Sequence, residues 1–255
     1  MWNSFNSNDY SGMIAETVRL PMPQGGSIRA YYSHPLGQGP HPGIVLIPHM
    51  PGWDEFLREA ARRFTEHGYS VVCPDIFTAY GDGAPAEVAA AAREVGGVTD
   101  AEAMDDTAAS LAFLRCQPDS NGKTGVIGMC SGGRHTFLAA CTVPGFDAAV
   151  DCWGGGVVAK PEDATPARPV APIEYAEQLA CPLLGIFGNE DFSPTRADVD
   201  VLEARLKELG KDYTFYRYDG AGHGIWYYDK PMYRQQAAMD SWNKALAFFE
   251  THLKE

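Results

Sequence analysis

The 255-residue chain has few cysteines, few basic residues and no long apolar run, and each shortage excludes a class of protein. Six cysteines are too few for a disulfide scaffold of this length, and the absence of any Cys-x-x-Cys pair excludes zinc ribbons and thioredoxin-like redox proteins. No segment approaches the ~18 apolar residues of a membrane span. Residues 1–10 lack the basic start and apolar run of a signal peptide. We therefore expect a cytoplasmic protein with reduced thiols and no membrane partner.

Positive charge is also scarce, since 20 Lys and Arg residues against 33 Asp and Glu residues give a formal net charge of −13. Such an acidic surface repels phosphate backbones, so nucleic acid is not an expected partner. The remaining composition, 45% hydrophobic and 11% aromatic, is that of an ordinary globular protein. Folds of the α/β class with about 200–250 residues routinely form one domain. We expect a single domain over residues 1–255, as a monomer or a small homo-oligomer.

The sequence predicts two kinds of strand. Residues 14–22 and 27–34 alternate apolar and polar side chains around a Pro-Gln-Gly-Gly turn, which is typical of an antiparallel hairpin with one solvated face. A second group of runs is short and continuously apolar, as in strands that are buried on both faces of a parallel sheet. These runs are 43–47, 69–73, 124–128, 148–152 and 182–187, and a further strand is expected at 213–218.

Helical patterns fall between these strands, at 54–67, 99–115, 134–141, 194–209 and 230–253. This alternation predicts an α/β fold: a mostly parallel central sheet with an antiparallel N-terminal hairpin and helices on both faces. The proline-rich stretch 160–172 is expected to be a long loop, and long loops in compact domains are often functional.

The strongest local motif is Gly128-Met129-Cys130-Ser131-Gly132-Gly133, which lies between a predicted strand and a predicted helix. That context is typical of a nucleophile elbow, here with cysteine in place of serine. Glycines on both sides of Cys130 remove the Cβ atoms that would obstruct a sharp turn. At a helix N-terminus, backbone N–H groups lower the pKa of a thiol and can hold an oxyanion. The alternative is a glycine-rich turn with an inert buried cysteine.

Two further motifs follow later strands, in the order found in α/β-hydrolase triads. Asp191 ends the sequence Gly-Asn-Glu-Asp after the strand at 182–187, and His223 lies in Gly-Ala-Gly-His-Gly after the strand at 213–218. Taken singly, Asp191 could be a helix cap and His223 an ordinary loop histidine. Because the three residues follow three strands in this order, they indicate a Cys-His-Asp triad.

With these motifs, the opening hairpin and a Cys-Pro-Asp sequence after a strand, the chain resembles the dienelactone hydrolases (carboxymethylenebutenolidases) over nearly its whole length. These are cysteine hydrolases of the α/β-hydrolase fold, so the resemblance implies hydrolysis of a small ester or lactone without a cofactor or metal. It implies that Cys130 is the nucleophile, His223 the base and acid, and Asp191 the orienting carboxylate. The backbone N–H groups of Met50 and Ser131 would hold the oxyanion.

The chain departs from the family pattern at two places. His49 stands where the family usually has a glutamate that helps to ionise the thiol, and a histidine can support a thiolate but cannot supply a negative base. The alternative is a loop histidine packed against Trp53. Neither 77–80 nor 225–227 contains the arginine that dienelactone-cleaving members use for the substrate carboxylate. We therefore expect neutral or apolar substrates.

Aromatic residues near the motifs, namely Trp53, Trp153, Trp226 and Tyr227, could line an apolar pocket or could simply be core and lid packing. The spacing of histidines and acids does not match a metal motif such as His-Glu-x-x-His. Other functions remain open at this point: a thioesterase, amidase or promiscuous organophosphate esterase on the same triad, or a pseudo-hydrolase that binds a small ligand without turnover.

Overall fold

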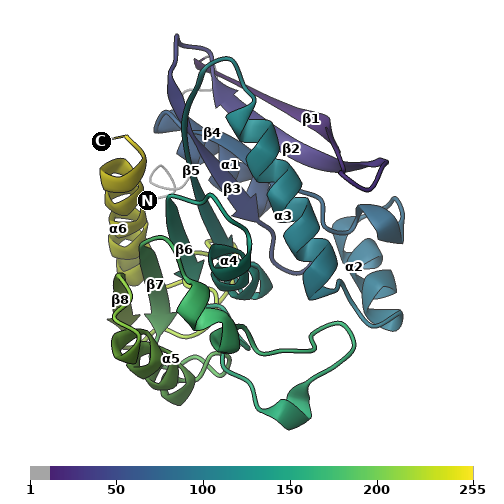
Figure 1. Cartoon of the computed structure of the whole chain (residues 1–255). Helices are drawn as coiled ribbons and strands as arrows, with labels where there is room; N and C mark the ends of the chain where they lie inside the picture. Colours follow the sequence, from purple (N-terminus) through teal and green to yellow (C-terminus); the bar gives the residue numbers. More distant parts are fainter. Residues whose placement is uncertain (1–11, 255) are drawn as a thin grey trace.

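The computed structural model describes residues 12–254, so the expectation for residues 1–10 lies outside the described range. Eight strands form one sheet in the order β1-β2-β4-β3-β5-β6-β7-β8 (Figure 1). β1 (Met13–Pro21) and β2 (Ser27–Pro35) form the antiparallel hairpin, and β2 also pairs antiparallel with β4. The remaining pairs are parallel. The predicted fold class is thereby confirmed.

The other strands alternate with α-helices along the chain. The strands are β3 (His41–Ile47), β4 (Ser70–Pro74), β5 (Ser120–Met129), β6 (Ala148–Cys152), β7 (Leu183–Gly188) and β8 (Tyr213–Tyr218). The α-helices are α1 (Glu55–Glu66), α2 (Pro85–Glu94), α3 (Asp100–Arg115), α4 (Ser131–Thr142), α5 (Arg196–Glu208) and α6 (Gln235–Leu253).

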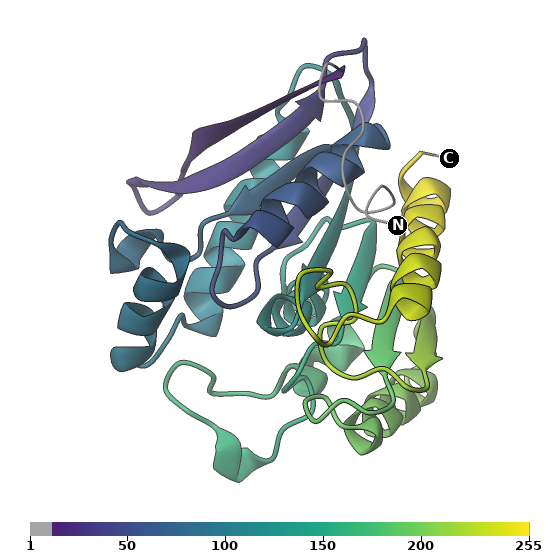
Figure 2. The same cartoon turned by 180° about the vertical axis from the view of Figure 1, so that it is seen from behind.

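Helices cover both faces of the sheet, with α1 and α6 on one face and α3, α4 and α5 on the other (Figures 1 and 2). The pleat of β3 shows why this strand is continuously apolar. Ile44 and Leu46 pack with the α1 and α6 side chains, while Val45 and Ile47 pack with those of α3 and α4. Because successive side chains point to opposite faces, a strand between two helical layers needs apolar residues at every position.

The helix boundaries follow local capping chemistry, with one expectation corrected. Thr99 caps α3 in a capping box with Glu102, as a helix starting near 99 requires. The last helix begins at Gln235 rather than at Lys230, because Pro231 has no N–H group and disfavours a helical conformation of the residue before it. α2 was not predicted, although its alanine-rich sequence and the proline at its start favour a helix.

The carboxyl ends of the parallel strands lie at one edge of the sheet, and the loops that follow them gather there (Figure 1). The longest of these loops follows β6 and includes the short helices η4 (Pro161–Asp163) and η5 (Pro172–Gln178). Ligand sites of open parallel sheets lie outside this edge. Within the described range, no helix is long and apolar enough to span a bilayer.

Candidate active site

Cys130 lies at the sharp turn between β5 and α4, where its backbone has φ 57° and ψ −121°. This left-handed conformation is costly for a residue with a Cβ atom, and such strain is typical of functional positions. The neighbouring glycines are needed for close approach: a Cβ on Gly128 would lie 2.3 Å from the Gly132 carbonyl oxygen, and one on Gly132 would lie 2.3 Å from that of Ile47. The turn therefore packs directly against the end of β3.

Cys130 differs from the other cysteines in its surroundings. Its side chain is half-buried at the start of α4, whereas Cys116 is exposed at the end of α3. Burial raises the thiol pKa of the other four, to about 12 in two cases; the four are Cys73, Cys141, Cys152 and Cys181. A raised pKa leaves little thiolate at neutral pH, so these four are inert as nucleophiles.

His223 and Asp191 meet from the loops that follow β8 and β7. The His223 Nδ1 donates to Asp191 Oδ2 at 2.9 Å, and Asp191 Oδ1 also accepts from the Ser193 backbone N–H at 2.9 Å. The two loops are joined by a backbone hydrogen bond of 2.9 Å from Glu190 N–H to the Ala221 carbonyl oxygen. Asp191 is buried, while Glu190 is exposed. Of these two acids, Asp191 is thus the one that contacts the imidazole.

The surroundings of His223 favour its charged form. Burial opposes the charge, but hydrogen bonds to Asp191 and Cys130, together with the negative charges of both groups, outweigh burial and raise the pKa of His223 to about 10. The imidazole therefore has the carboxylate on one side and the Cys130 sulfur on the other. An imidazolium beside a thiol favours the thiolate and can later donate its proton.

Met50 and Ser131, the residues expected to hold the oxyanion, follow β3 and begin α4 at the same edge of the sheet. β3 and β5 run parallel and are paired as far as Ile47 and Gly128. Met50 therefore lies in the loop after β3, next to the elbow that follows β5. Ser131 is the first residue of α4, where a backbone N–H has no acceptor inside the helix. Among the backbone hydrogen bonds of residues 12–254, none is donated by Met50 or Ser131.

His49 is buried at the same edge and has a partner on each ring nitrogen. Its Nε2 lies 2.8 Å from Asp54 Oδ2, and its Nδ1 lies 2.5 Å from the Tyr227 hydroxyl. The ring packs against Phe56 and Tyr227, with centroid separations of 5.9 and 4.9 Å. His49 is thus part of an ordered network and not simply a loop histidine packed against Trp53.

Two cavities lie at neighbouring loops, and neither has Cys130, Asp191 or His223 in its lining. One of about 300 Å³ lies beside the loop after β3 and is lined by Pro51, Trp53 and Phe77, among others. The second, of about 600 Å³, lies against the loop after β6 and is lined by Arg134 and Ser193, among others.

The model of the dienelactone hydrolase family matches residues 28–253. The chain belongs to this family. A protein of Methylorubrum extorquens named "Putative carboxymethylenebutenolidase" is 31% identical over 249 residues, which cover 96% of this chain and 84% of that protein. The crystal structure of a "Putative Dienelactone Hydrolase" from Klebsiella pneumoniae has a TM-score of 0.85 at 27% identity, covering 93% of this chain and 98% of that one.

A more distant relative from Bradyrhizobium, named "Probable 2-oxo-3-(5-oxofuran-2-ylidene)propanoate lactonase", is 24% identical over 246 residues, covering 94% of this chain and 98% of that protein. The family and its carboxymethylenebutenolidases are ester and lactone hydrolases. This dienelactone hydrolase family member is accordingly an enzyme that hydrolyses carboxylic esters or lactones on an α/β-hydrolase fold.

For two of the aromatic residues near the motifs, the structure favours core packing, the second of the two interpretations left open. Trp153 and Trp226 are both 0% exposed, and their rings meet edge to face at 5.5 Å. Trp226 packs on Trp242 of α6 and donates its Nε1–H to Ser241 Oγ at 2.8 Å. Both rings pack in the core cluster that includes the α6 side chains, where a partner satisfies the Trp226 N–H. Trp53, by contrast, lines the smaller cavity.

Three residues of this dienelactone hydrolase site were not singled out from the sequence. In the sequence, Asp54 had only the signature of a helix N-cap. It does cap α1, since its Oδ1 accepts from the Leu57 backbone N–H at 2.9 Å. Arg168 comes from the 160–172 loop, and its charge interacts with that of Cys130. Phe192 is 80% exposed, and its ring centroid lies 5.7 Å from that of His223. No local pattern marks Arg168 or Phe192 as site residues.

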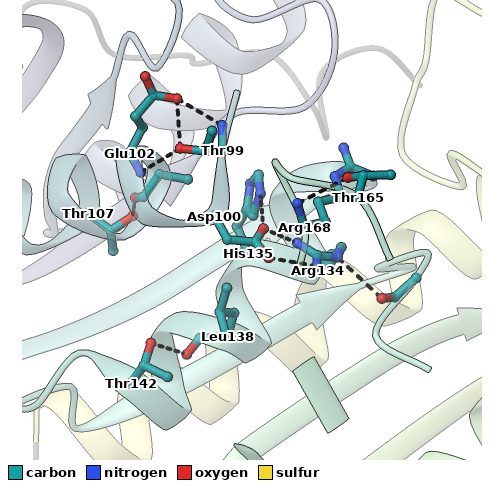
Figure 3. A network of polar contacts seen from close by, with 12 residues as sticks. Thr99, Asp100, Glu102, Thr107, Arg134, His135, Leu138, Thr142, Thr165 and Arg168 are labelled. Carbon is teal, nitrogen blue, oxygen red and sulfur yellow. Dashed lines mark hydrogen bonds and ion pairs between the residues drawn. The ribbon is translucent and has the colours of Figure 1, made fainter. Parts of the chain in front are cut away.

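Arg134, the arginine nearest to Cys130 in sequence, is held in an ion pair (Figure 3). It donates through both Nη atoms to Asp100, with Nη2 at 2.9 Å, and through Nε to the Gly156 carbonyl oxygen at 3.2 Å. Burial raises the pKa of Asp100, but hydrogen bonds from His135 and Arg134 outweigh burial and lower it to about 2. This cluster joins the start of α3 to α4, so the Arg134 side chain has a structural partner already.

Proposed function

We propose that the enzyme hydrolyses its ester or lactone by acyl transfer to Cys130. The thiolate attacks the carbonyl carbon, and the resulting oxyanion is held by the backbone N–H groups of Met50 and Ser131. The intermediate collapses, the C–O bond breaks, and the leaving alkoxide takes a proton from His223. A water molecule, deprotonated by His223, then attacks the acyl thioester and releases the carboxylic acid and the thiol. Asp191 keeps the imidazole oriented throughout.

The observation that carries this proposal is the pairing around His223. A 2.9 Å hydrogen bond to Asp191 on one ring nitrogen, with the strained Cys130 at the other side of the ring, is the arrangement of nucleophile, base and orienting acid that acyl transfer requires. A pseudo-hydrolase that only binds a ligand has no need of a left-handed cysteine or of a paired imidazole. The arrangement therefore favours turnover.

Replacement of Cys130 tests the mechanism. In Cys130→Ala, we expect kcat for p-nitrophenyl acetate to fall by about 10³-fold or more, because the proposed nucleophile is lost and burial raises the pKa of the four buried thiols. Far-ultraviolet circular dichroism and urea unfolding check that the fold is retained. Cys116→Ala removes the exposed cysteine and is the matched control, which should retain parental activity. Turnover by Cys130→Ala at a rate close to that of the parent would contradict the proposal.

For the substrate, we propose a neutral or apolar ester or lactone. Neither 77–80 nor 225–227 contains an arginine, and the exposed ring of Phe192 lies beside the imidazole. A carboxylate that enters a desolvated pocket without an opposing charge costs on the order of 2–5 kcal/mol. An apolar group contributes contact area without that cost.

A second candidate substrate is a lactone with a free carboxylate. The observation in its favour is Arg168, whose charge interacts with that of Cys130 although the loop that carries it follows β6. The Bradyrhizobium relative is named for a propanoate lactone, which carries such a group. An arginine gives a carboxylate bidentate hydrogen bonds. The two candidates predict opposite preferences between a carboxylated lactone and its neutral ester.

A further inference from the structure

A third cavity, of about 310 Å³, has none of the triad residues in its lining. Three segments enclose it: the turn of the β1–β2 hairpin, the loop after β4 and the first turns of α3. α3 contributes the acids Glu102, Asp105 and Asp106, and no lysine or arginine is part of the lining. The other two segments contribute the apolar side chains of Met22, Ile28, Ile76 and Ala79.

Asp106 is buried at this cavity without a partner for its carboxylate. The residue is only 7% exposed, and within residues 12–254 no hydrogen bond or ion pair reaches its side-chain oxygens. These oxygens are not sealed by the protein, because Asp106 lines the cavity. Buried carboxylates are ordinarily paired or hydrogen-bonded. An unpaired one at a cavity wall indicates a partner that comes from outside the chain.

The other two acids have partners, but these partners are uncharged. Glu102 belongs to the capping box of α3 (Figure 3) and also accepts from the Tyr80 hydroxyl at 3.2 Å. Asp105 Oδ2 accepts from Gln24 Nε2 at 3.4 Å. Glu102 and Asp106 are four residues apart, a spacing at which like charges destabilise a helix. The three carboxylates therefore repel one another with no cation between them.

Arg29 approaches the cavity, but its charge is already paired. Its backbone N–H donates to Thr78 Oγ1, which lines the cavity, at 3.2 Å. Its guanidinium lies 2.8 Å from Asp75 Oδ2 and also pairs with Asp82. The arginine that is closest to hand therefore does not neutralise the acids of α3.

The charges that act on Asp106 are negative on every side. Burial raises the pKa of Asp106, and the charges of Glu102, Asp105 and Asp75 raise it further, to about 7. Burial also raises the pKa of Tyr80, and the charges of Glu102 and Asp106 add to this, so that its hydroxyl stays neutral. The hairpin turn brings no charged side chain. A cation in the cavity would relieve the repulsion among all of these acids.

The lining indicates which kind of cation fits. In the part of the chain that the structure describes, no three acidic, histidine or cysteine side chains are grouped so that they could hold a metal ion. A primary ammonium group instead donates hydrogen bonds to a carboxylate, and an apolar body attached to it packs on the apolar side chains opposite α3. The volume is at the lower end of the range for small-molecule sites, about 300–1,000 Å³.

We propose that this cavity binds a small primary amine in its ammonium form, with Asp106 as the ion-pair partner. The ammonium donates to the Asp106 carboxylate and reduces the repulsion among the three acids of α3. Cys130 takes no part, so the inference does not depend on the proposed function. The amine site and the hydrolytic site are separate sites on one domain.

Isothermal titration calorimetry with benzylamine at pH 8 tests the site. We expect one molecule to bind per chain, and neutral benzyl alcohol to bind at least tenfold more weakly, because it lacks the charge-assisted hydrogen bond. Asp106→Asn, with its fold checked by circular dichroism, should weaken benzylamine binding by the same factor. Glu94→Gln, an equal loss of charge at the exposed end of α2, should bind benzylamine as the parent does, and so should Cys130→Ala.

A second variant and a second pH identify the carboxylate. Gln24→Lys in the exposed hairpin turn places an ammonium of the chain itself beside Asp105, and this competitor should weaken benzylamine binding at least tenfold. Protons compete with the amine for a carboxylate whose pKa is about 7, so parental binding should be about tenfold weaker at pH 6 than at pH 8. Acids on the surface would hold the amine equally well at both pH values.

Parental affinity for benzylamine in both Asp106→Asn and Gln24→Lys would overturn the inference, as would equal binding of benzyl alcohol. Loss of benzylamine binding in Cys130→Ala would place the amine in the hydrolytic site and would also overturn it. A titration with calcium chloride checks the class of ligand. Saturable calcium binding that is lost in Asp106→Asn would make the cavity a metal site and would contradict the assignment to amines.

Discussion

His223 illustrates how the neighbours of one side chain set its chemistry. An imidazole in an unfolded chain has a pKa of about 6.5. In the folded protein, burial alone would lower this value, but Asp191 and Cys130 raise it to about 10. Since the folded pKa lies above the unfolded one, these interactions stabilise the fold fully below pH ~6.5. That contribution is lost as the pH rises through about 10.

Replacement of the orienting acid should show this effect in a titration. In Asp191→Asn, the charged hydrogen bond to His223 becomes a neutral one, and such bonds are worth about 1.5–3 kcal/mol, so we expect the His223 midpoint to fall by about 1–2 units. Histidine ring protons followed by NMR against pH report the midpoint directly, and kcat should fall as the imidazole loses its orientation. A His223 midpoint equal to the parental one would rule out Asp191 as the partner that sets it.

At the scale of elements, the elbow depends on how closely β3, β5 and α4 approach one another. The N-terminus of α4 lies against the last residues of β3, and glycine is the residue that permits this. A Cβ on Gly132 would lie 2.3 Å from the Ile47 carbonyl oxygen and 2.9 Å from that of Pro48. Both contacts are with backbone, which cannot move aside as a flexible side chain can. The position of Cys130 therefore depends on a glycine two residues away.

The variant Gly132→Ala should accordingly damage both stability and catalysis. Overpacking of this kind costs about 1–3 kcal/mol of unfolding free energy. A displacement of about 1 Å at the nucleophile lowers kcat by about 10²-fold. Urea unfolding and steady-state kinetics measure the two effects. Gly37→Ala is the control, because a Cβ there meets nothing within 4 Å and should leave both quantities unchanged. Parental stability and kcat in Gly132→Ala would show that α4 can move away from β3.

At the scale of the whole molecule, one edge of the sheet collects loops of different charge. The net charge of −13 gives a long-range repulsion of anionic substrates, although salt screens it beyond roughly 8–10 Å. Near Cys130, the 160–172 loop contributes Arg168, which works in the opposite direction. Binding of an anionic substrate therefore depends on two opposing effects. Arg168 attracts the substrate, whereas the acidic surface repels it and the family arginines that would bind its carboxylate are missing.

The comparison of a carboxylated dienelactone with its methyl ester measures this balance. We expect kcat/KM to be higher for the methyl ester, because the free acid loses its hydration without gaining a paired arginine at 77–80 or 225–227. Arg168→Gln and the control Arg196→Gln, at the exposed start of α5, should then behave like the parent. A preference of tenfold or more for the free acid, about 1.4 kcal/mol, that disappears only in Arg168→Gln would establish the carboxylated lactone as the substrate class.

The sequence by itself determined the features that depend on local pattern. Continuous apolar runs predicted the strands of a sheet covered on both faces, because each buried face requires apolar residues. The glycines around Cys130 predicted the elbow, because close backbone approach excludes a Cβ atom. The chain order of Cys130, Asp191 and His223 predicted that they follow strands of one parallel sheet, whose carboxyl ends share an edge. The structure brings Asp191 and His223 into hydrogen-bond contact there.

Only the tertiary structure decided which residues meet across the chain. His49 and Tyr227 are 178 positions apart, and nothing near either residue indicates that they form a hydrogen bond. Arg168 interacts with Cys130 because of the course of a long loop, and Trp153 is buried in the core although it follows a strand at the edge where the site lies. Strand register, loop path and side-chain packing set these contacts, and each depends on all the elements of the fold together.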